Sequence, residues 1–163
     1  MEYIYIMISI IVVCIILIVY ISIYNIFQSY LLKINETEKE IDESLRKKYD
    51  ILFKIKQKED LEIEMQEIKD KNLSSFEFYR EIIEIETNII NLTNNRKIEK
   101  EDLDEINIKI ESQIKYYNEN ISNYNNATTK FPSNIISKIS RKKIKNYFDD
   151  KNLYDKNKKD FKI

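Results

Sequence analysis

The residues with the clearest capacity for chemistry form an acidic cluster near the middle of the chain. Its members are Glu59, Asp60, Glu62, Glu64 and Glu67. Carboxylates at helical spacing can bind a divalent cation, which would suit a carboxylate-metal enzyme. The sequence has no histidine and no glycine, so it lacks the commonest metal ligand of that kind and the glycine of an EF-hand loop. We interpret the cluster as a solvated helix face and expect no catalytic residue, metal or cofactor.

Other kinds of site are excluded by composition. The absence of histidine rules out a Ser-His-Asp arrangement. The single cysteine, Cys14, can form neither a disulfide within one chain nor a thiolate zinc site. A formal net charge of −1 gives no overall field that would attract nucleic acid. An enzyme is therefore the least favoured class of function.

Two further polar clusters invite interpretation. Asp42 and Asp50 flank the basic run 46–48, in which Arg46 follows Asp42 by one helical turn and Lys48 is the last member. Such an exposed pair contributes only ~0.3–0.5 kcal/mol, so helix stabilisation and bundle specificity explain the cluster better than a ligand site.

The second is a basic stretch near the C-terminal end. Its cations are Lys138, Arg141, Lys142, Lys143 and Lys145, with isoleucines and aromatic residues among them. As an amphipathic helix, it could dock on anionic lipid or on a protein partner. It could equally bury its isoleucines in a helical bundle, and both interpretations stay open.

The N-terminal part of the chain is apolar. No charged residue occurs between Tyr3 and Leu32, and a spanning helix needs ~20 apolar residues. A signal peptide would start with basic residues, whereas this chain has Glu2. We therefore predict an uncleaved anchor over residues 1–24, with positions such as Ile4, Ile11, Ile18 and Tyr24 along the span.

The distribution of lysine and arginine predicts the orientation of this anchor. None precedes the apolar stretch, and Lys33 is the first to follow it. The positive-inside rule then places the N-terminus outside the cell membrane and the rest of this single-pass protein in the cytoplasm.

The remaining chain reads as long helices, because it has no glycine and one proline. One helix is expected from Asn25 to Asp70, with a single apolar face that includes Ile34, Ile41, Leu45, Leu52 and Ile55. A second is expected after Ser74, where Glu77 completes a capping box. A third should start near Glu99, and a short fourth should run from Pro132 to Phe148.

The predicted fold class is all-α. It comprises an N-terminal transmembrane helix and an antiparallel up-and-down bundle of three to four helices over residues 25–148. Residues 149–163 are rich in lysine, aspartate and asparagine, and we expect a disordered tail there.

A Tyr-Asn pair occurs twice in the third helix, at Tyr117-Asn118 and Tyr124-Asn125. Residues seven apart share a helix face, so both tyrosines should be buried, near Ile41–Leu52 of the first helix. The asparagines could then bind the tyrosine hydroxyls. Phe131-Pro132 should reverse the chain at the end of the bundle.

Two stretches resemble the LemA family of bacterial membrane proteins. Tyr24–Ile55 resembles the family's Tyr-Asn after the membrane helix, followed by Ile-Asp, Leu, a basic pair and Asp-Leu. Tyr116–Ser137 resembles its paired Tyr-Asn and Phe-Pro. The positions concerned are Tyr24, Asn25, Ile41, Asp42, Leu45, Lys48, Asp50, Tyr117, Asn118, Tyr124, Asn125, Phe131 and Pro132.

The likeness has departures. The family usually has Arg where this chain has Lys48 and Pro-Asn where it has Phe53-Lys54, and the stretch from Asp60 to Asp102 matches poorly. The resemblance implies an N-terminal anchor and a soluble helical bundle, and it implies no enzyme activity.

The expected function is that of a non-catalytic, membrane-tethered scaffold or partner-binding protein. Its partners would be the lipid bilayer and a membrane or cytoplasmic protein, and association with a second copy of the chain stays open. The alternative is a protein that organises the membrane through its basic C-terminal helix. A carboxylate-metal enzyme comes third.

Overall fold

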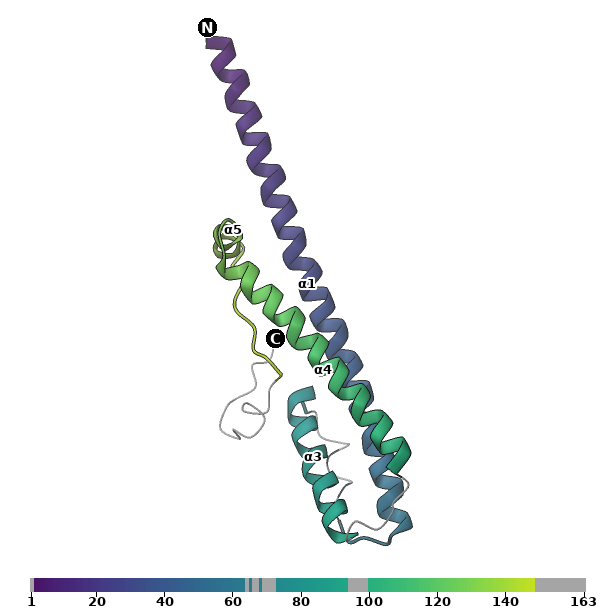
Figure 1. Ribbon diagram of the computed structural model, residues 1–163. Coiled ribbons are helices and arrows are strands. Elements are labelled where there is room, and N and C mark those ends of the chain that lie inside the picture. Colours follow the sequence, from purple (N-terminus) through teal and green to yellow (C-terminus); the bar gives the residue numbers. More distant parts are fainter. Residues whose placement is uncertain (1, 64, 66–67, 69–72, 94–99, 149–163) are drawn as a thin grey trace. The chain divides into compact units, whose positions relative to one another are not determined.

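The computed structural model describes residues 2–63, 65, 68, 73–93 and 100–148 (Figure 1). Over these residues the regular structure is helical and no strand occurs, so the predicted all-α fold is confirmed. The helices are α1 (Glu2–Lys58), α3 (Ser75–Leu92), α4 (Lys100–Thr129) and α5 (Ser133–Ile139). The predicted tail, 149–163, lies outside the described residues.

Helix α1 ends at Lys58, well before the predicted end at Asp70. Asp60 has a φ of 50°, and the Leu61 amide donates to the Lys56 carbonyl at 3.1 Å. Aspartate is one of the few residues that tolerate this left-handed conformation. Acidic side chains are also unfavourable at the C-terminal end of a helix, because they face the negative end of its dipole. The acidic run therefore ends the helix.

Helix α3 begins as predicted. The Glu77 amide donates to Ser74 Oγ at 3.3 Å, and the Ser74 amide donates to Glu77 Oε2 at 2.9 Å. This capping box satisfies two amides that the first turn of a helix leaves without helical partners.

Helix α5 is shorter than predicted, because it ends at Ile139 rather than Phe148. Arg141 has a φ of 52°, and the Lys142 amide donates to the Ser137 carbonyl at 2.9 Å, which closes the helix. Residues Lys142–Phe148, which we call the return segment, are not helical. Their backbone binds side chains of α4 instead of forming further helical turns, as described below.

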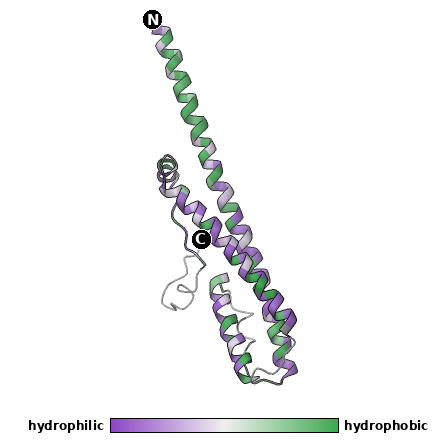
Figure 2. Ribbon diagram, viewed as in Figure 1, coloured by the Kyte–Doolittle hydropathy of each residue, from purple (hydrophilic) through white to green (hydrophobic). Residues whose placement is uncertain are grey.

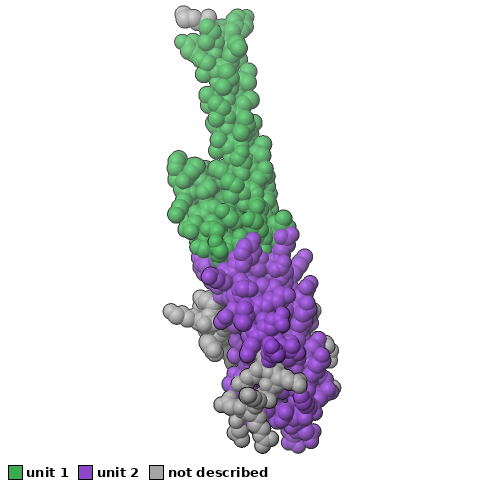
Figure 3. Space-filling model, turned by 45° about the vertical axis from the view of Figure 1, so that its right-hand side comes forward, with its two compact units in different colours: residues 1–35, 119–146 green, residues 36–118, 147–163 purple. Residues whose placement is uncertain are grey.

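The chain divides into two compact units (Figure 3). Unit 1 comprises residues 1–35 and 119–146, and unit 2 comprises residues 36–118 and 147–163. The core of unit 1 contains Phe27, Ile34, Ile121, Tyr124 and Ile136. The core of unit 2 contains Ile41, Leu45, Leu52, Phe78, Ile82, Ile89, Ile110, Tyr117 and Phe148.

The first part of α1 is apolar (Figure 2). Its large apolar side chains from Tyr3 to Val19 are 45–82% exposed. By length and composition this part of the helix can cross a membrane.

Candidate functional site

The buried face of α1 follows a seven-residue repeat. Phe27, Ile34, Ile41 and Ile55 occupy equivalent positions of this repeat and are buried. The equivalent residue between Ile41 and Ile55 is Lys48, which is only 4% exposed. A buried charge is costly unless it is paired and hydrogen-bonded, so this position requires a partner.

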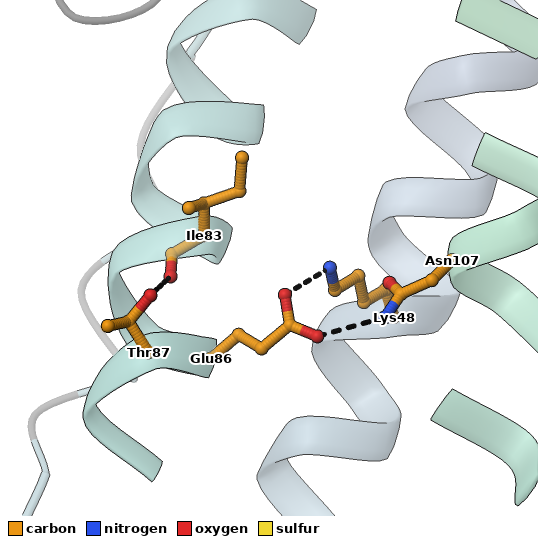
Figure 4. A network of polar contacts seen from close by, with 5 residues as sticks. All are labelled: Lys48, Ile83, Glu86, Thr87 and Asn107. Carbon is orange, nitrogen blue, oxygen red and sulfur yellow. Dashed lines mark hydrogen bonds and ion pairs between the residues drawn. The ribbon is translucent and has the colours of Figure 1, made fainter. Parts of the chain in front are cut away.

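Glu86 of α3 is that partner (Figure 4). Its Oε2 accepts a hydrogen bond from Lys48 Nζ at 2.6 Å, and its Oε1 accepts one from Asn107 Nδ2 of α4 at 3.0 Å. The side chains of Lys48 and Glu86 are 5% and 15% exposed. Three helices of unit 2 thus meet at one carboxylate, and we call Lys48, Glu86 and Asn107 the polar centre.

The chemistry of the polar centre suits alignment of helices. The ammonium and carboxylate neutralise each other, and the Asn107 amide binds the second carboxylate oxygen. A single polar residue in an apolar seam specifies which helices pair and in which register, at some cost in stability.

The basic run predicted as one cluster with Asp42 and Asp50 has two different parts. Lys48 is buried, whereas Arg46 is exposed and forms the predicted ion pair with Asp42, with Nε and Oδ2 2.8 Å apart. The Arg46 guanidinium also lies 5.3 Å from the centre of the Phe78 ring. The predicted helix-stabilising role therefore fits Arg46, while Lys48 belongs to the core.

Both tyrosines of the repeated pair are buried, as predicted, at 2% exposure. The Tyr117 ring lies edge-on to Phe148, with centroids 6.0 Å apart. The Tyr124 ring lies edge-on to Phe27 at the same separation, upstream of the predicted neighbourhood Ile41–Leu52. Burial raises the pKa of both phenols, and the nearby Glu38 carboxylate raises the pKa of Tyr117 further.

The asparagines of the pairs have a different role from the predicted one. Asn118 Nδ2 donates to the Phe148 carbonyl at 2.6 Å, and its Oδ1 accepts from the Phe148 amide at 2.7 Å. Asn125 binds the carbonyl and amide of Lys145 in the same way, both at 2.9 Å. Each side-chain amide therefore binds both backbone groups of one residue in the return segment.

Phe148 completes an aromatic cluster in unit 2. Its ring stacks on Phe76 with centroids 4.3 Å apart and meets the ring of Tyr79 at 5.3 Å. Together with Tyr117, these rings bury Phe148 to 1% exposure. The Asn118 bonds therefore hold a residue whose side chain belongs to the core.

The other predicted site residues differ in burial. Ile41 and Leu45 are fully buried, whereas Asn25, Asp50 and the Phe131-Pro132 pair are exposed. Of the basic stretch, Lys138, Arg141 and Lys143 are exposed, Lys142 lies 5.2 Å from the Tyr24 ring centre, and Lys145 is bound through its backbone.

Part of the acidic cluster lies in the described residues. Glu59, Asp60 and Glu62 are exposed, as expected for a solvated surface, but they follow the end of α1 and do not form the predicted helix face. Glu64 and Glu67 lie outside the described residues. Within the described ranges, no group of three or more His, Cys, Asp or Glu residues could hold a metal ion.

Glu86, Asn107 and Phe148 are the important residues that the sequence analysis missed. The position of Lys48, seven residues after Ile41 in an apolar repeat, would have indicated a buried cation that needs an acid. Nothing comparable in the sequence selects Glu86 among the many acids of the chain.

The fold and the site define a class of protein. It is an all-helical protein with a candidate membrane anchor at the start of α1 and a polar centre in its helical bundle. The model of the LemA family matches residues 33–162, and the chain therefore belongs to the LemA family. No curated protein and no solved structure matches the chain.

Proposed function

We propose that the chain is a non-catalytic scaffold that is tethered to the cell membrane by residues 4–24 and binds a protein partner through its bundle. The observation that carries this proposal is the division within α1. The helix begins with exposed apolar side chains and continues into a stripe of buried ones, such as Ile34 and Ile41. Exposed apolar residues over the length of a bilayer favour a lipid environment.

The non-catalytic part of the proposal rests on the use of the polar groups. The sequence has no histidine, and the buried Lys48 and Glu86 bind each other. Asn118 and Asn125 bind backbone groups. These contacts support a role in holding the bundle together.

The anchor is tested by placing charge in the middle of the apolar stretch. A charged residue at the centre of a span costs roughly 3 kcal/mol, so Ile11→Lys with Ile15→Lys should abolish retention in carbonate-washed membranes. Ile11→Val with Ile15→Val is the matched control and should be retained. Equal fractionation of the two variants would contradict the anchor.

The proposed orientation places the bundle in the cytoplasm, because Lys33 and the later cations follow the apolar stretch. Protease added to intact cells should then leave the bundle uncut and should cut it after the membrane is permeabilised. Digestion of the bundle in intact cells would reverse the orientation.

Partner binding is tested at apolar residues that α4 exposes in unit 2. Ile108 and Tyr116 are 68% and 48% exposed. A photo-crosslinking residue at either position should give a discrete adduct in native membranes, whereas the exposed Lys54 position should not. An adduct of twice the chain's mass would identify a second copy as the partner. Absence of discrete adducts at both apolar positions would contradict the scaffold role.

A further inference from the structure

Unit 1 exposes a row of large apolar side chains at α5. Phe131, Ile135 and Ile139 recur at every fourth residue and are 79%, 51% and 64% exposed. Residues four apart on a helix are neighbours, so Ile135 and Ile139 lie on one face of α5, and Phe131 comes just before its start. Contiguous exposed apolar side chains mark an interaction surface.

The turn that follows α5 contacts the end of the apolar stretch of α1, within the same unit. Ser140 Oγ is 3.4 Å from Tyr20 Oη. The Lys142 ammonium is 5.2 Å from the centre of the Tyr24 ring. Tyrosines at the end of a membrane span lie at the level of the lipid headgroups. These contacts therefore place the end of α5 at that level when α1 is inserted.

The charge around α5 has one sign. No acidic residue occurs between Asn120 and Phe148. The cations in this interval are Lys130, Lys138, Arg141, Lys142, Lys143 and Lys145. Lys138, Arg141 and Lys143 are exposed and lie within four residues of Ile139 in the sequence. Apolar side chains rimmed by cations favour an anionic membrane surface over neutral lipid.

We propose that Phe131, Ile135 and Ile139, with the cations Lys138, Arg141 and Lys143, form a surface that docks on anionic lipid headgroups. We call it the α5 surface. The bilayer that it contacts is the one that holds α1, so this inference rests on the proposed anchor. The isoleucines and phenylalanine enter the interface between headgroups and acyl chains, and the cations bind lipid phosphates.

The α5 surface differs from the basic amphipathic helix expected from sequence. Helix α5 has only seven residues, Ser133–Ile139, and the turn after it carries Arg141. The return segment, which contains Lys145, packs on α4 through Asn125. The proposed lipid contact is therefore limited to α5, the turns on either side of it and Lys143, and it does not include the rest of the return segment.

The chain has no tryptophan, so one introduced tryptophan reports its own surroundings without background. The full chain is reconstituted in nanodiscs that contain brominated phosphatidylcholine, with or without phosphatidylglycerol. Three single-tryptophan variants are compared. Ile11→Trp reports the anchor and Ile139→Trp the α5 surface. Glu119→Trp is an exposed control on α4 of the same unit, about 15 Å of helix rise before the end of that helix.

We expect bromine to quench Ile11→Trp in both lipids. Ile139→Trp should be quenched and blue-shifted when phosphatidylglycerol is present, and Glu119→Trp should be unaffected. High salt should reduce the quenching of Ile139→Trp, because it screens the attraction between cations and lipid.

The charges are tested in the Ile139→Trp background. Lys138→Gln, Arg141→Gln and Lys143→Gln together should abolish the quenching of this tryptophan in phosphatidylglycerol. The matched control replaces three of the exposed lysines of unit 2, Lys47, Lys54 and Lys109, by glutamine and should retain the quenching. Equal quenching in the two triple variants would overturn the role of the basic residues.

The two proposals fail in distinguishable ways. Quenching of Ile11→Trp without quenching of Ile139→Trp would overturn the lipid-binding role of the α5 surface and leave the anchor intact. The exposed apolar row would then be a binding surface for a protein. Absence of quenching at Ile11→Trp would overturn the anchor and this inference with it.

Discussion

The two Tyr-Asn pairs of α4 have the same sequence and equally buried tyrosines, but their surroundings differ. Tyr117 belongs to an aromatic cluster with Phe76 and Phe148, whereas Tyr124 meets the single ring of Phe27. The asparagines, in contrast, make the same pair of bonds to a backbone residue of the return segment. The comparison teaches that the common role of the repeat belongs to its asparagines, while each tyrosine serves its own local core.

The seven-residue spacing of the repeat follows from this role. Residues that are seven apart in an α-helix are separated by about 10.5 Å along the helix axis. The backbone residues that the two asparagines bind, Lys145 and Phe148, are three apart, and three extended residues span about 10 Å. Two asparagines that are seven residues apart on a helix are therefore separated by about the same distance as two residues that are three apart in an extended chain.

The largest expected effect comes from removing the tyrosine rings. Tyr117→Ala should lower the free energy of unfolding by about 3–5 kcal/mol, the usual loss for a buried aromatic residue. Tyr124→Ala should cost roughly 1 kcal/mol less, because it loses one aromatic contact where Tyr117→Ala loses two. Urea unfolding of the full chain in detergent, followed by circular dichroism, measures both. Equal losses would remove the proposed difference between the two surroundings.

The polar centre lies in the unit that contains Tyr117, and its disruption should have a similar or slightly smaller effect. Glu86→Leu leaves the buried Lys48 cation without its partner, which typically costs about 3–5 kcal/mol. Adding Lys48→Met to Glu86→Leu should restore most of the stability, because no buried charge then remains. The same urea experiment tests both variants. A double variant as unstable as the single one would show that packing, rather than charge, dominates at this position.

The asparagine bonds should contribute less than the rings. Asn118→Ala and Asn125→Ala each remove two hydrogen bonds, worth about 0.5–1.5 kcal/mol apiece. The two losses should be alike, in contrast to the tyrosine variants. Amide hydrogen exchange should accelerate at Phe148 in the first variant and at Lys145 in the second. Acceleration of both amides by either variant would indicate that the return segment is released as a whole.

The smallest effect at neutral pH is expected from the tyrosine hydroxyls. The folded pKa of Tyr117 lies above the unfolded value of about 10, because burial and the Glu38 carboxylate disfavour the phenolate. Above pH 10 the native chain therefore holds more protons than the unfolded chain, and its stability falls as the pH rises toward the folded pKa. Tyr117→Phe should remove this contribution and flatten the decline.

Tyr124→Phe is the matched comparison, because the pKa of Tyr124 is also raised by burial but without a neighbouring carboxylate among its causes. Unfolding as a function of pH measures both variants. A decline above pH 10 that is unchanged in Tyr117→Phe would assign it to other groups.

The sequence was sufficient to predict the helices, the capping box at Ser74 and the burial of both tyrosines. These features depend on local periodicity and on residues close together in the chain. The predicted end of α1, Asp70, lies twelve residues beyond the observed end, Lys58. The prediction followed the apolar periodicity, which does not include the unfavourable interaction of acidic side chains with the C-terminal end of a helix.

The sequence was not sufficient to predict the contacts between distant segments. The bonds of Asn118 to Phe148 and of Glu86 to Lys48 join residues 30 and 38 positions apart. Propensity favours a helix for the basic stretch after Ile139, but tertiary contacts override it, since an extended chain brings Phe148 into the aromatic cluster. The concentration of cations between Asn120 and Phe148 was visible in the sequence, and the overall charge of −1 conceals it.

The return segment has a consequence for the order of events during biosynthesis. Translation proceeds from the N-terminus, so the residues that form α1, α3 and α4 exist before Lys142–Phe148 are made. Until then, Asn118 and Asn125 are hydrated, and the place of Phe148 among Phe76, Tyr79 and Tyr117 is open. A nascent chain paused at this stage presents an unfilled aromatic slot that chaperones and proteases can recognise. Docking of the return segment closes the slot, so the core of unit 2 can be completed only after this part of the chain has been made.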